Sequence, residues 1–300
     1  MKGEKEAFIN NIANSIAFTF SISAYIIIKI FIEPTNNVVL AFPFDIIMIC
    51  FIVIYIPFFI MLMFIEKKKI RKEKILRSKF IQLPPNLPLK YDIYRKMTHL
   101  VVLGIIFLYF IPNVFAQDLV VFLVGVSLIG LLTADISRIL LPEFYPLKPI
   151  NQILKKKELH MRLGPHISMS IGCFSIILLF GLIKPIGPII ISTTMAMAIL
   201  GDMASNLVGR AIGKNKIRNT NKTYEGLFAG IITAFLSGFL VLKVLGYVYK
   251  LENFGVILIP VFGSIVIGTI DYFDLEIDDN LSYNIFTSVV LFFISIFLFQ

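Results

Sequence analysis

The chain has 300 residues, of which 57% are hydrophobic and only 16% are charged, and its mean hydropathy is +0.86. Soluble globular domains carry about 25% charged residues, so this composition excludes a water-soluble globular fold. The net charge of +9 does not indicate a nucleic-acid partner, because the lysines and arginines are concentrated in short loops between apolar runs, as in cytoplasmic loops of membrane proteins.

Nine apolar segments are long enough to cross the ~30 Å hydrocarbon core of a bilayer, which takes about 20 residues of helix. The sequence therefore predicts an all-α, polytopic integral membrane protein with about nine transmembrane helices. Glycine, proline and aspartate interrupt the sixth and the eighth segment. The predicted ranges are 8–32, 40–65, 97–115, 119–141, 163–183, 186–207, 227–248, 255–273 and 281–299.

The chain divides at a proline-rich stretch, residues 82–88, which cannot continue a helix. Residues 1–88 are predicted to form an N-terminal two-span unit with a basic cytoplasmic linker that binds anionic lipid headgroups. Residues 89–300 are predicted to form the catalytic membrane domain, because the residues capable of chemistry all follow the linker.

Basic residues separate the loops into two kinds. The connections 67–96, 148–162 and 210–222 are strongly basic, whereas the connections between them carry one lysine in total. The positive-inside rule places the basic loops and the N-terminus in the cytoplasm and the C-terminus outside. We therefore expect a multi-pass protein with its active site on the cytoplasmic face, in the plasma membrane of a prokaryote or an endoplasmic-reticulum-like membrane of a eukaryote.

The segment from Gly201 to Gly226 has the densest set of polar residues. An acidic residue such as Asp202 in an apolar span is costly and usually functional. Asp202 lies about 12 Å along a helix before Arg210, so the two side chains can bracket a polyphosphate, Asp202 through a metal ion and Arg210 directly. Gly213 lacks a side chain where backbone would approach a ligand. The alternative is that Asp202 only packs helices and that the basic loop only sets topology.

Three groups of residues in this segment form a composite motif with specific spacing. They are Gly201-Asp202 with Ala204, Gly209-Arg210 with Gly213-Lys214, and Asn221-Lys222-Thr223 with Glu225-Gly226. The composite resembles the core motif of CTP-dependent lipid kinases, the family of dolichol kinase, phytol kinase and yeast-type diacylglycerol kinase. CDP-diacylglycerol synthases share a version of the same block.

Other places support this resemblance, which covers the chain from about residue 92 onward. Arg95-Lys96 with His99 opens the third predicted span, as a similar motif does in the family. Asp278-Asp279-Asn280 resembles the family's Asp-Asn motif, although Tyr283 and Asn284 stand where the family has an apolar residue and a proline.

The resemblance implies a kinase that transfers the γ-phosphate of CTP to a lipid alcohol: a polyprenol such as dolichol, a phytol-like alcohol or diacylglycerol. It implies Mg²⁺ as cofactor, held by Asp202 and Asp279, since Mg²⁺ is commonly bound by one or two carboxylates plus substrate phosphates. The residues expected to contact the nucleotide are Arg95, Lys96, Arg210, Gly213, Lys214, Lys222, Thr223 and Asn280.

Four side chains are candidates for catalysis: Asp202, Glu225, His99 and Asp135. Neighbouring cations would keep His99 neutral and able to accept a proton. Asp135 lies three residues before Arg138, so an ion pair on one helix face is its alternative role.

Two other functions stay open from the sequence. A phosphatidate cytidylyltransferase would use the same metal and basic residues, but the second block of that family, with its Pro-Gly-His-Gly-Gly run, does not follow Gly226. A transporter would place polar groups at the bilayer midplane and show related halves, whereas most polar residues here lie at the ends of predicted spans. The sequence does not indicate which lipid is the acceptor or what the oligomeric state is.

Overall fold

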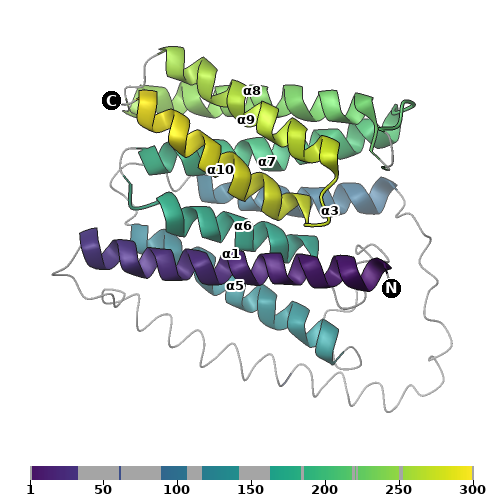
Figure 1. Ribbon diagram of the computed structural model, residues 1–300, viewed down its shortest axis with the longest axis horizontal. Helices are drawn as coiled ribbons and strands as arrows, with labels where there is room; N and C mark the ends of the chain where they lie inside the picture. The colour runs from purple at the N-terminus through teal and green to yellow at the C-terminus, as the bar shows by residue number, and fades with distance from the viewer. Residues whose placement is uncertain are drawn as a thin grey trace.

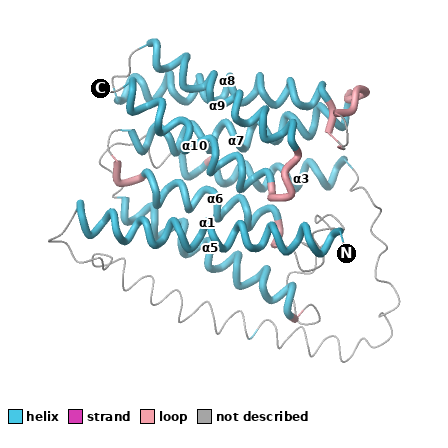
Figure 2. Tube along the Cα trace, in the orientation of Figure 1, coloured by secondary structure: helices cyan, strands magenta, loops and turns pink. Residues whose placement is uncertain are grey.

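The structure is a computed structural model that describes residues 2–32, 61, 89–106, 117–141, 163–183, 186–217, 220, 222–249 and 253–298. These residues form eight α-helices and no strand, which confirms the all-α prediction for this part of the chain (Figures 1 and 2). The helices are α1 (Lys2–Ile32), α3 (Leu89–Val102), α5 (Gln117–Leu140), α6 (Pro165–Phe180), α7 (Ile186–Ala211), α8 (Tyr224–Tyr249), α9 (Asn253–Phe273) and α10 (Asp279–Leu298).

Six of these helices, α1, α5, α7, α8, α9 and α10, are long and apolar enough to cross a membrane, and α6 is apolar but shorter. The chain is therefore a multi-pass integral membrane protein. The predicted count of nine spans is not confirmed. Segment 40–65 lies outside the described residues apart from position 61, and of segment 97–115 the structure describes α3 to Val102, a turn at Leu103 and the residues to 106.

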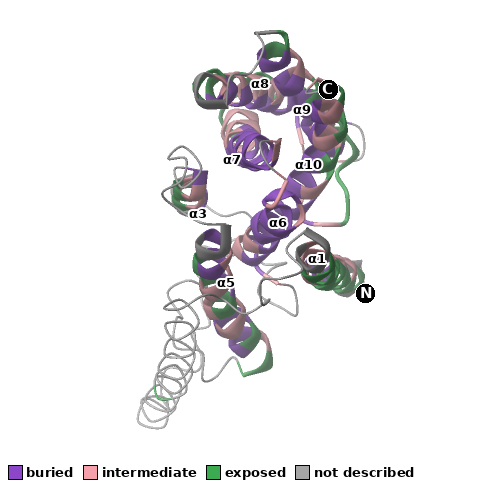
Figure 3. Ribbon diagram, turned by 90° about the vertical axis from the view of Figure 1, so that its left-hand side faces the viewer, coloured by how far each residue is buried: buried purple, intermediate pink, exposed green. Residues whose placement is uncertain are grey.

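Helices α6 and α7 lie at the centre of the bundle, and their side chains are the most completely buried (Figure 3). Helices α7, α8, α9 and α10 pack in sequence, and α10 returns against both α6 and α7. Helices α1 and α5 flank α6, and α3 lies beside α7. Helix α1 thus packs against the predicted catalytic domain, although the sequence assigns it to a separate unit.

Helices α5 to α10 alternate in direction, and α1 and α3 both begin at the same end of the bundle, so that this end gathers chain segments that are distant in sequence (Figure 1). The C-terminal ends of α5, α7 and α9 lie there together with the N-terminal ends of α1, α6, α8 and α10, on the right of Figure 1. We call this the polar end, because the polar segments singled out in the sequence meet at it.

Helices α7 and α8 approach each other along two facing rows of small residues. A Cβ atom added to Gly226 would come 2.7 Å from the backbone oxygen of Ser205 and 3.0 Å from Cα of Gly209, and one added to Gly201 would come 3.1 Å from Cβ of Ala234. Small residues spaced four apart in sequence let the backbones of transmembrane helices approach closely. The rows, here called the glycine seam, are Gly201, Ser205 and Gly209 on α7 and Gly226, Gly230 and Ala234 on α8.

Alanine at Gly226 should destabilise the protein by about 1–3 kcal/mol, the usual cost of overpacking, because the new methyl group meets backbone atoms that cannot rotate away. Gly255→Ala is the matched control, since a Cβ at Gly255 meets only Leu298 Cδ1, at an ordinary 3.7 Å. Thermal unfolding of both variants in detergent measures the difference. Equal stability of the two variants would contradict the close packing of α7 on α8.

Candidate functional site

The first element of the site is an ion pair between α3 and α7. The ammonium group of Lys96 donates to Oδ2 of Asp202, and each side chain is only 4% exposed. Asn206, one turn further along α7, donates to the other carboxylate oxygen at 2.7 Å. Charged groups buried in a membrane bundle are costly and usually functional. This contact joins two motifs that the sequence predicts to act together.

The second element is Lys222, in the connection before α8, which meets three carboxylates. Its Nζ lies 2.8 Å from Oδ1 of Asp271, 3.0 Å from Oδ2 of Asp279 and 3.3 Å from Oδ1 of Asp274. Burial alone would lower the pKa of Lys222, but the attraction of Asp279, Asp271 and Asp274 outweighs it and raises the pKa well above the usual range. The lysine is therefore charged at physiological pH.

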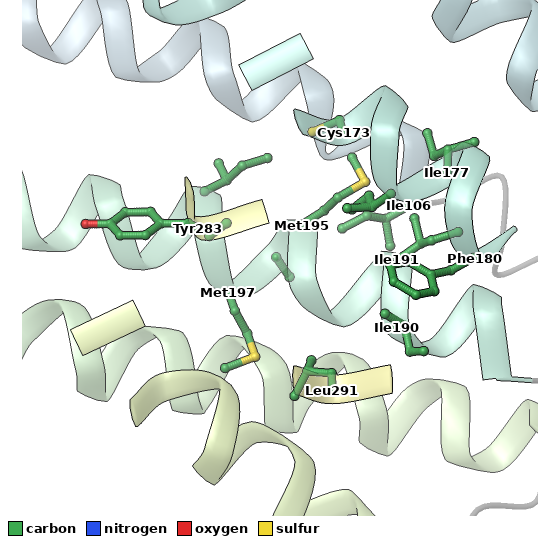
Figure 4. Close-up of a cluster of buried hydrophobic side chains, with 14 of the residues drawn as sticks. Ile106, Cys173, Ile177, Phe180, Ile190, Ile191, Met195, Met197, Tyr283 and Leu291 are labelled. Atoms are coloured by element: carbon green, nitrogen blue, oxygen red, sulfur yellow. The ribbon is translucent and has the colours of Figure 1, made fainter. Parts of the chain in front are cut away.

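Two hydroxyl groups hold Asp271 in place. Ser205 on α7 donates to Oδ2 at 2.7 Å, and Tyr283 on α10 donates to Oδ1 at 3.0 Å. Figure 4 shows the Tyr283 hydroxyl pointing away from the apolar cluster around Met195 and Ile191. Tyr283 is one of the departures from the lipid-kinase pattern, and its hydroxyl group helps to orient the Asp271 carboxylate. The other departure, Asn284, packs beside Gly172, where a Cβ atom would come 3.1 Å from Cβ of Asn284.

The two groups of ion pairs are linked through α7, because Ser205, three residues after Asp202, donates to Asp271, a partner of Lys222. We call the six charged residues of the two groups the lysine–aspartate cluster. Its four carboxylates outnumber its two ammonium groups. The members are Lys96, Asp202, Lys222, Asp271, Asp274 and Asp279.

The connection between α7 and α8 folds back on itself beside this cluster. Ile217 donates its amide to the Lys222 carbonyl at 2.9 Å, and Tyr224 donates to the Asn215 carbonyl at 2.9 Å. Thr223 caps α8, since its Oγ1 accepts the Gly226 amide at 3.2 Å. This tight turn at the start of α8 fixes the backbone from which Lys222 extends.

Several predicted nucleotide residues and one predicted catalytic residue lie in this connection or in the helix turns that flank it. Arg210, in the last turn of α7, and Lys214, in the connection, are exposed, as a phosphate contact requires. Glu225 accepts hydrogen bonds from the backbone and side-chain nitrogens of Asn215, at 3.1 and 2.7 Å, and so organises the loop. Gly213 lies two residues after the end of α7, and a Cβ atom there would meet the Gly209 oxygen at 2.2 Å. Close packing against Gly209 and Thr223 therefore requires glycine at position 213, independently of any ligand.

Asp135 belongs to a different contact set at the polar end. Its Oδ1 accepts from Nε of Arg138 at 2.7 Å, and its Oδ2 accepts the amide of Gly164 at 2.8 Å. Gly164 is the N-cap residue of α6 and precedes Pro165, so Asp135 ties the end of α5 to the start of α6. The structure therefore shows the ion-pair alternative for Asp135, and its catalytic role stays a prediction.

The motif at the start of the third predicted span is described in part. His99 follows Lys96 by three residues, which places the two on one face of α3, and both are buried, at 4% exposure. Met97, between them, is exposed. The backbone of Arg95 lies in α3, but its side chain is outside the described set, so its predicted nucleotide contact stays untested.

Asp202 and Asp279 are the residues predicted to hold Mg²⁺, and the oxygen donors near them can be compared with what Mg²⁺ requires. Among the described residues, no three His, Cys, Asp or Glu side chains lie close enough together to bind a metal ion unaided. The donor chemistry nevertheless fits Mg²⁺, which takes oxygen ligands and keeps places for substrate phosphates. Oδ1 of Asn280, next to Asp279, is buried and has no hydrogen-bond partner in the described part of the structure, so it is a further available oxygen.

The fold and the cluster together define a class: a multi-pass helical membrane protein with one buried and several partly buried lysine–aspartate pairs near one end of its bundle. Comparison of the chain with protein-family models, with curated proteins and with solved structures gives no match. The particular activity is therefore argued from the site itself and from the motifs in the sequence.

Proposed function

We propose that this protein is an integral-membrane kinase that transfers the γ-phosphate of CTP to a lipid alcohol. The observation that carries the proposal is the lysine–aspartate cluster, in which Lys222 of the lipid-kinase-like motif pairs with Asp279 of the distant Asp-Asn motif. Residues that only pack helices together do not require charges from four helices and two connecting loops, three of which, Lys96, Asp202 and Asp271, are buried. A shared reaction centre accounts for their meeting.

The distribution of charge supports a triphosphate substrate. Phosphoryl transfer depends mainly on positioning and on neutralising charge. Arg210, in the last turn of α7, and Lys214, in the connection that follows, are exposed and would clamp the phosphates together with Lys222. Asp202 and Asp279 would hold Mg²⁺, which bridges phosphate oxygens and neutralises their charge when bound. The carboxylates and the basic residues therefore have complementary tasks at one place.

The surroundings of Lys96 support a lipid acceptor. Ile93, Met97 and Val101 on α3 are 39%, 53% and 78% exposed, so the outward face of the helix that carries Lys96 is apolar. A lipid alcohol lying along α3 would keep its chain in contact with this surface while its hydroxyl group reaches the polar end. The CTP specificity and the lipid class come from the resemblance.

The proposed reaction needs a proton acceptor. The hydroxyl oxygen of the lipid attacks the γ-phosphorus, the bond from that phosphorus to the bridging oxygen of the β-phosphate breaks, and CDP leaves. The hydroxyl proton passes to a base, and we assign His99 to this role, because it shares a buried face of α3 with Lys96. Glu225 is assigned to the loop, where its carboxylate is already hydrogen-bonded to Asn215.

Labelled nucleotide tests the proposal. Purified protein is incubated with Mg²⁺, a lipid alcohol and CTP that carries the label at either the α or the γ phosphorus. A kinase puts only the γ label into the lipid and releases CDP. Label entering from the α position, with a lipid phosphate as acceptor, would identify a cytidylyltransferase instead. Absence of label in lipid from both nucleotides, with dolichol, phytol and diacylglycerol as alcohols and phosphatidate as the lipid phosphate, would refute both.

A transporter is the candidate from a different class, and one set of side chains favours it. The hydroxyl groups of Ser192, Thr193, Thr194 and Thr287 are buried in α7 and α10 and have no hydrogen-bond partner in the described part of the chain. They are uncharged, however, whereas the charged side chains lie at the polar end. Nucleotide-independent uptake of a solute by proteoliposomes would support transport.

A further inference from the structure

Helix α1 packs against the rest of the bundle through polar side chains. Asn10, Asn14 and Ser21 are completely buried, whereas apolar residues on other faces, such as Phe8 and Phe20, are 65% and 64% exposed. The inward face of α1 therefore combines these three buried polar side chains with apolar ones such as Ala7 and Phe18, while large apolar side chains also cover its outward face. In lipid, where apolar contacts favour no particular face, hydrogen bonds between helices fix which face turns inward.

These polar side chains contact α6 at three levels. Asn11 Oδ1 accepts the amide of Leu163 at 3.0 Å, just before α6 begins. Asn14 donates to Oγ of Ser168 at 3.1 Å, and Ser21 donates to Oγ of Ser175 at 3.1 Å. The N-terminal helix is thus bonded along α6, the central helix of the predicted catalytic domain.

One contact leads from α1 to the proposed site. Oδ1 of Asn10 accepts the backbone amide of Asp278 at 2.9 Å, across 268 residues of sequence. The Asp278 carboxylate in turn accepts the backbone and side-chain nitrogens of Asn280, at 3.1 and 2.8 Å, and so caps α10. Asp279, between these two residues, reaches Lys222.

We propose that Asn10 is a positioning residue that anchors the Asp278–Asn280 turn, so that α1 is a working part of the reaction centre and not a separate anchor. The inference of a catalytic effect rests on the proposed function, whereas the anchoring itself does not. Asn10 does not touch the reacting groups in this scheme. It acts by fixing the backbone that carries Asp279 and Asn280.

Asn10→Ala and Asn14→Ala are the matched pair that tests this. Both remove a completely buried asparagine from the same face of α1, but only Asn10 bonds to the Asp278 amide. Hydrogen exchange followed by mass spectrometry should show about tenfold faster exchange in peptides covering 274–280 for Asn10→Ala, the loss expected for one buried hydrogen bond. Asn14→Ala should leave these peptides unchanged.

In the lipid-kinase assay, Asn10→Ala should lower kcat about tenfold and leave KM for the lipid nearly unchanged, whereas Asn14→Ala should retain wild-type kcat. Asn10→Asp keeps an acceptor oxygen for the amide and should keep slow exchange in 274–280, which supplies a test should the alanine variant not fold. Equal exchange in the Asn10→Ala and Asn14→Ala proteins, or fast exchange in Asn10→Asp, would overturn the anchor. If wild-type protein has no kinase activity, the proposed function fails, and the exchange data still decide the anchor.

Discussion

An Asp202→Asn variant is expected to lose phosphoryl transfer by about 10²–10³-fold, the usual effect of removing one electrostatic contact to a reacting group, while the protein still inserts into the membrane. The amide keeps the shape of the carboxylate but gives up its charge, so neither Lys96 nor a metal ion retains its partner. Lipid-kinase activity per amount of membrane-inserted protein, at saturating CTP and Mg²⁺, is the measurement.

The ion pair complicates this experiment, because removing one member of a buried pair leaves an uncompensated charge and costs about 3–5 kcal/mol. The double variant Lys96→Met with Asp202→Asn removes both charges and should recover most of the stability but none of the activity. Activity near wild type in either protein would disprove the assignment of Asp202 to the reaction. Recovery of activity in the double variant alone would reduce the pair to a structural role.

Lys222→Met should destabilise the protein by about 3 kcal/mol, at the low end of the range for a broken buried pair, because Lys222 and Asp279 are partly exposed. Three carboxylates would then repel one another around an apolar side chain. The raised pKa of Lys222 means that its stabilisation is fully present below about pH 10.4, the ordinary pKa of lysine, and is lost only as the pH rises through the higher folded-state value. Denaturant or thermal unfolding between pH 6 and 9 measures it.

Two further lysine variants make the result interpretable. Lys243→Met removes a charge of the same type from an exposed position on α8 and should change stability by no more than about 0.5 kcal/mol. Lys222→Arg keeps the positive charge and should retain most of the stability, though a planar guanidinium does not replace a compact ammonium group. A Lys222→Met protein as stable as Lys243→Met would show that the three carboxylates do not depend on Lys222.

The sequence predicts that the distant polar motifs lie on the same side of the membrane, because successive spans run in opposite directions. Asp202 and Asp279 are 77 residues apart, yet apolar segments of spanning length that alternate in direction must return their polar ends to the same side. The structure agrees with this for helices α7 to α10, because α8 and α10 begin at the same end of the bundle (Figure 1), where Lys222 pairs with Asp279. The face of the membrane on which that end lies stays a prediction.

The sequence does not predict how each helix is rotated about its axis. Sequence reasoning therefore missed the site residues whose contribution depends on which way their side chains face. Ser205 and Tyr283 hold Asp271, but a serine or a tyrosine in an apolar span faces lipid or protein with nearly equal ease. The buried asparagines of α1 were missed for the same reason: hydropathy averages over all faces of a helix. Tyr283 carried the one usable signal, because it stands where the resembled family has an apolar residue.

The glycine seam makes it possible to distinguish positions kept for helix packing from positions kept for chemistry when relatives of this sequence are compared. Any relative that keeps the α7–α8 crossing must keep small residues at Gly201, Gly226 and Gly230, because backbone or Cβ atoms occupy the space, whatever reaction it catalyses. Exposed Arg210 and Lys214 carry no such packing constraint. If these two positions prove invariant in an alignment of relatives, selection for chemistry is the explanation, whereas invariance of the glycines alone would report only inheritance of the fold.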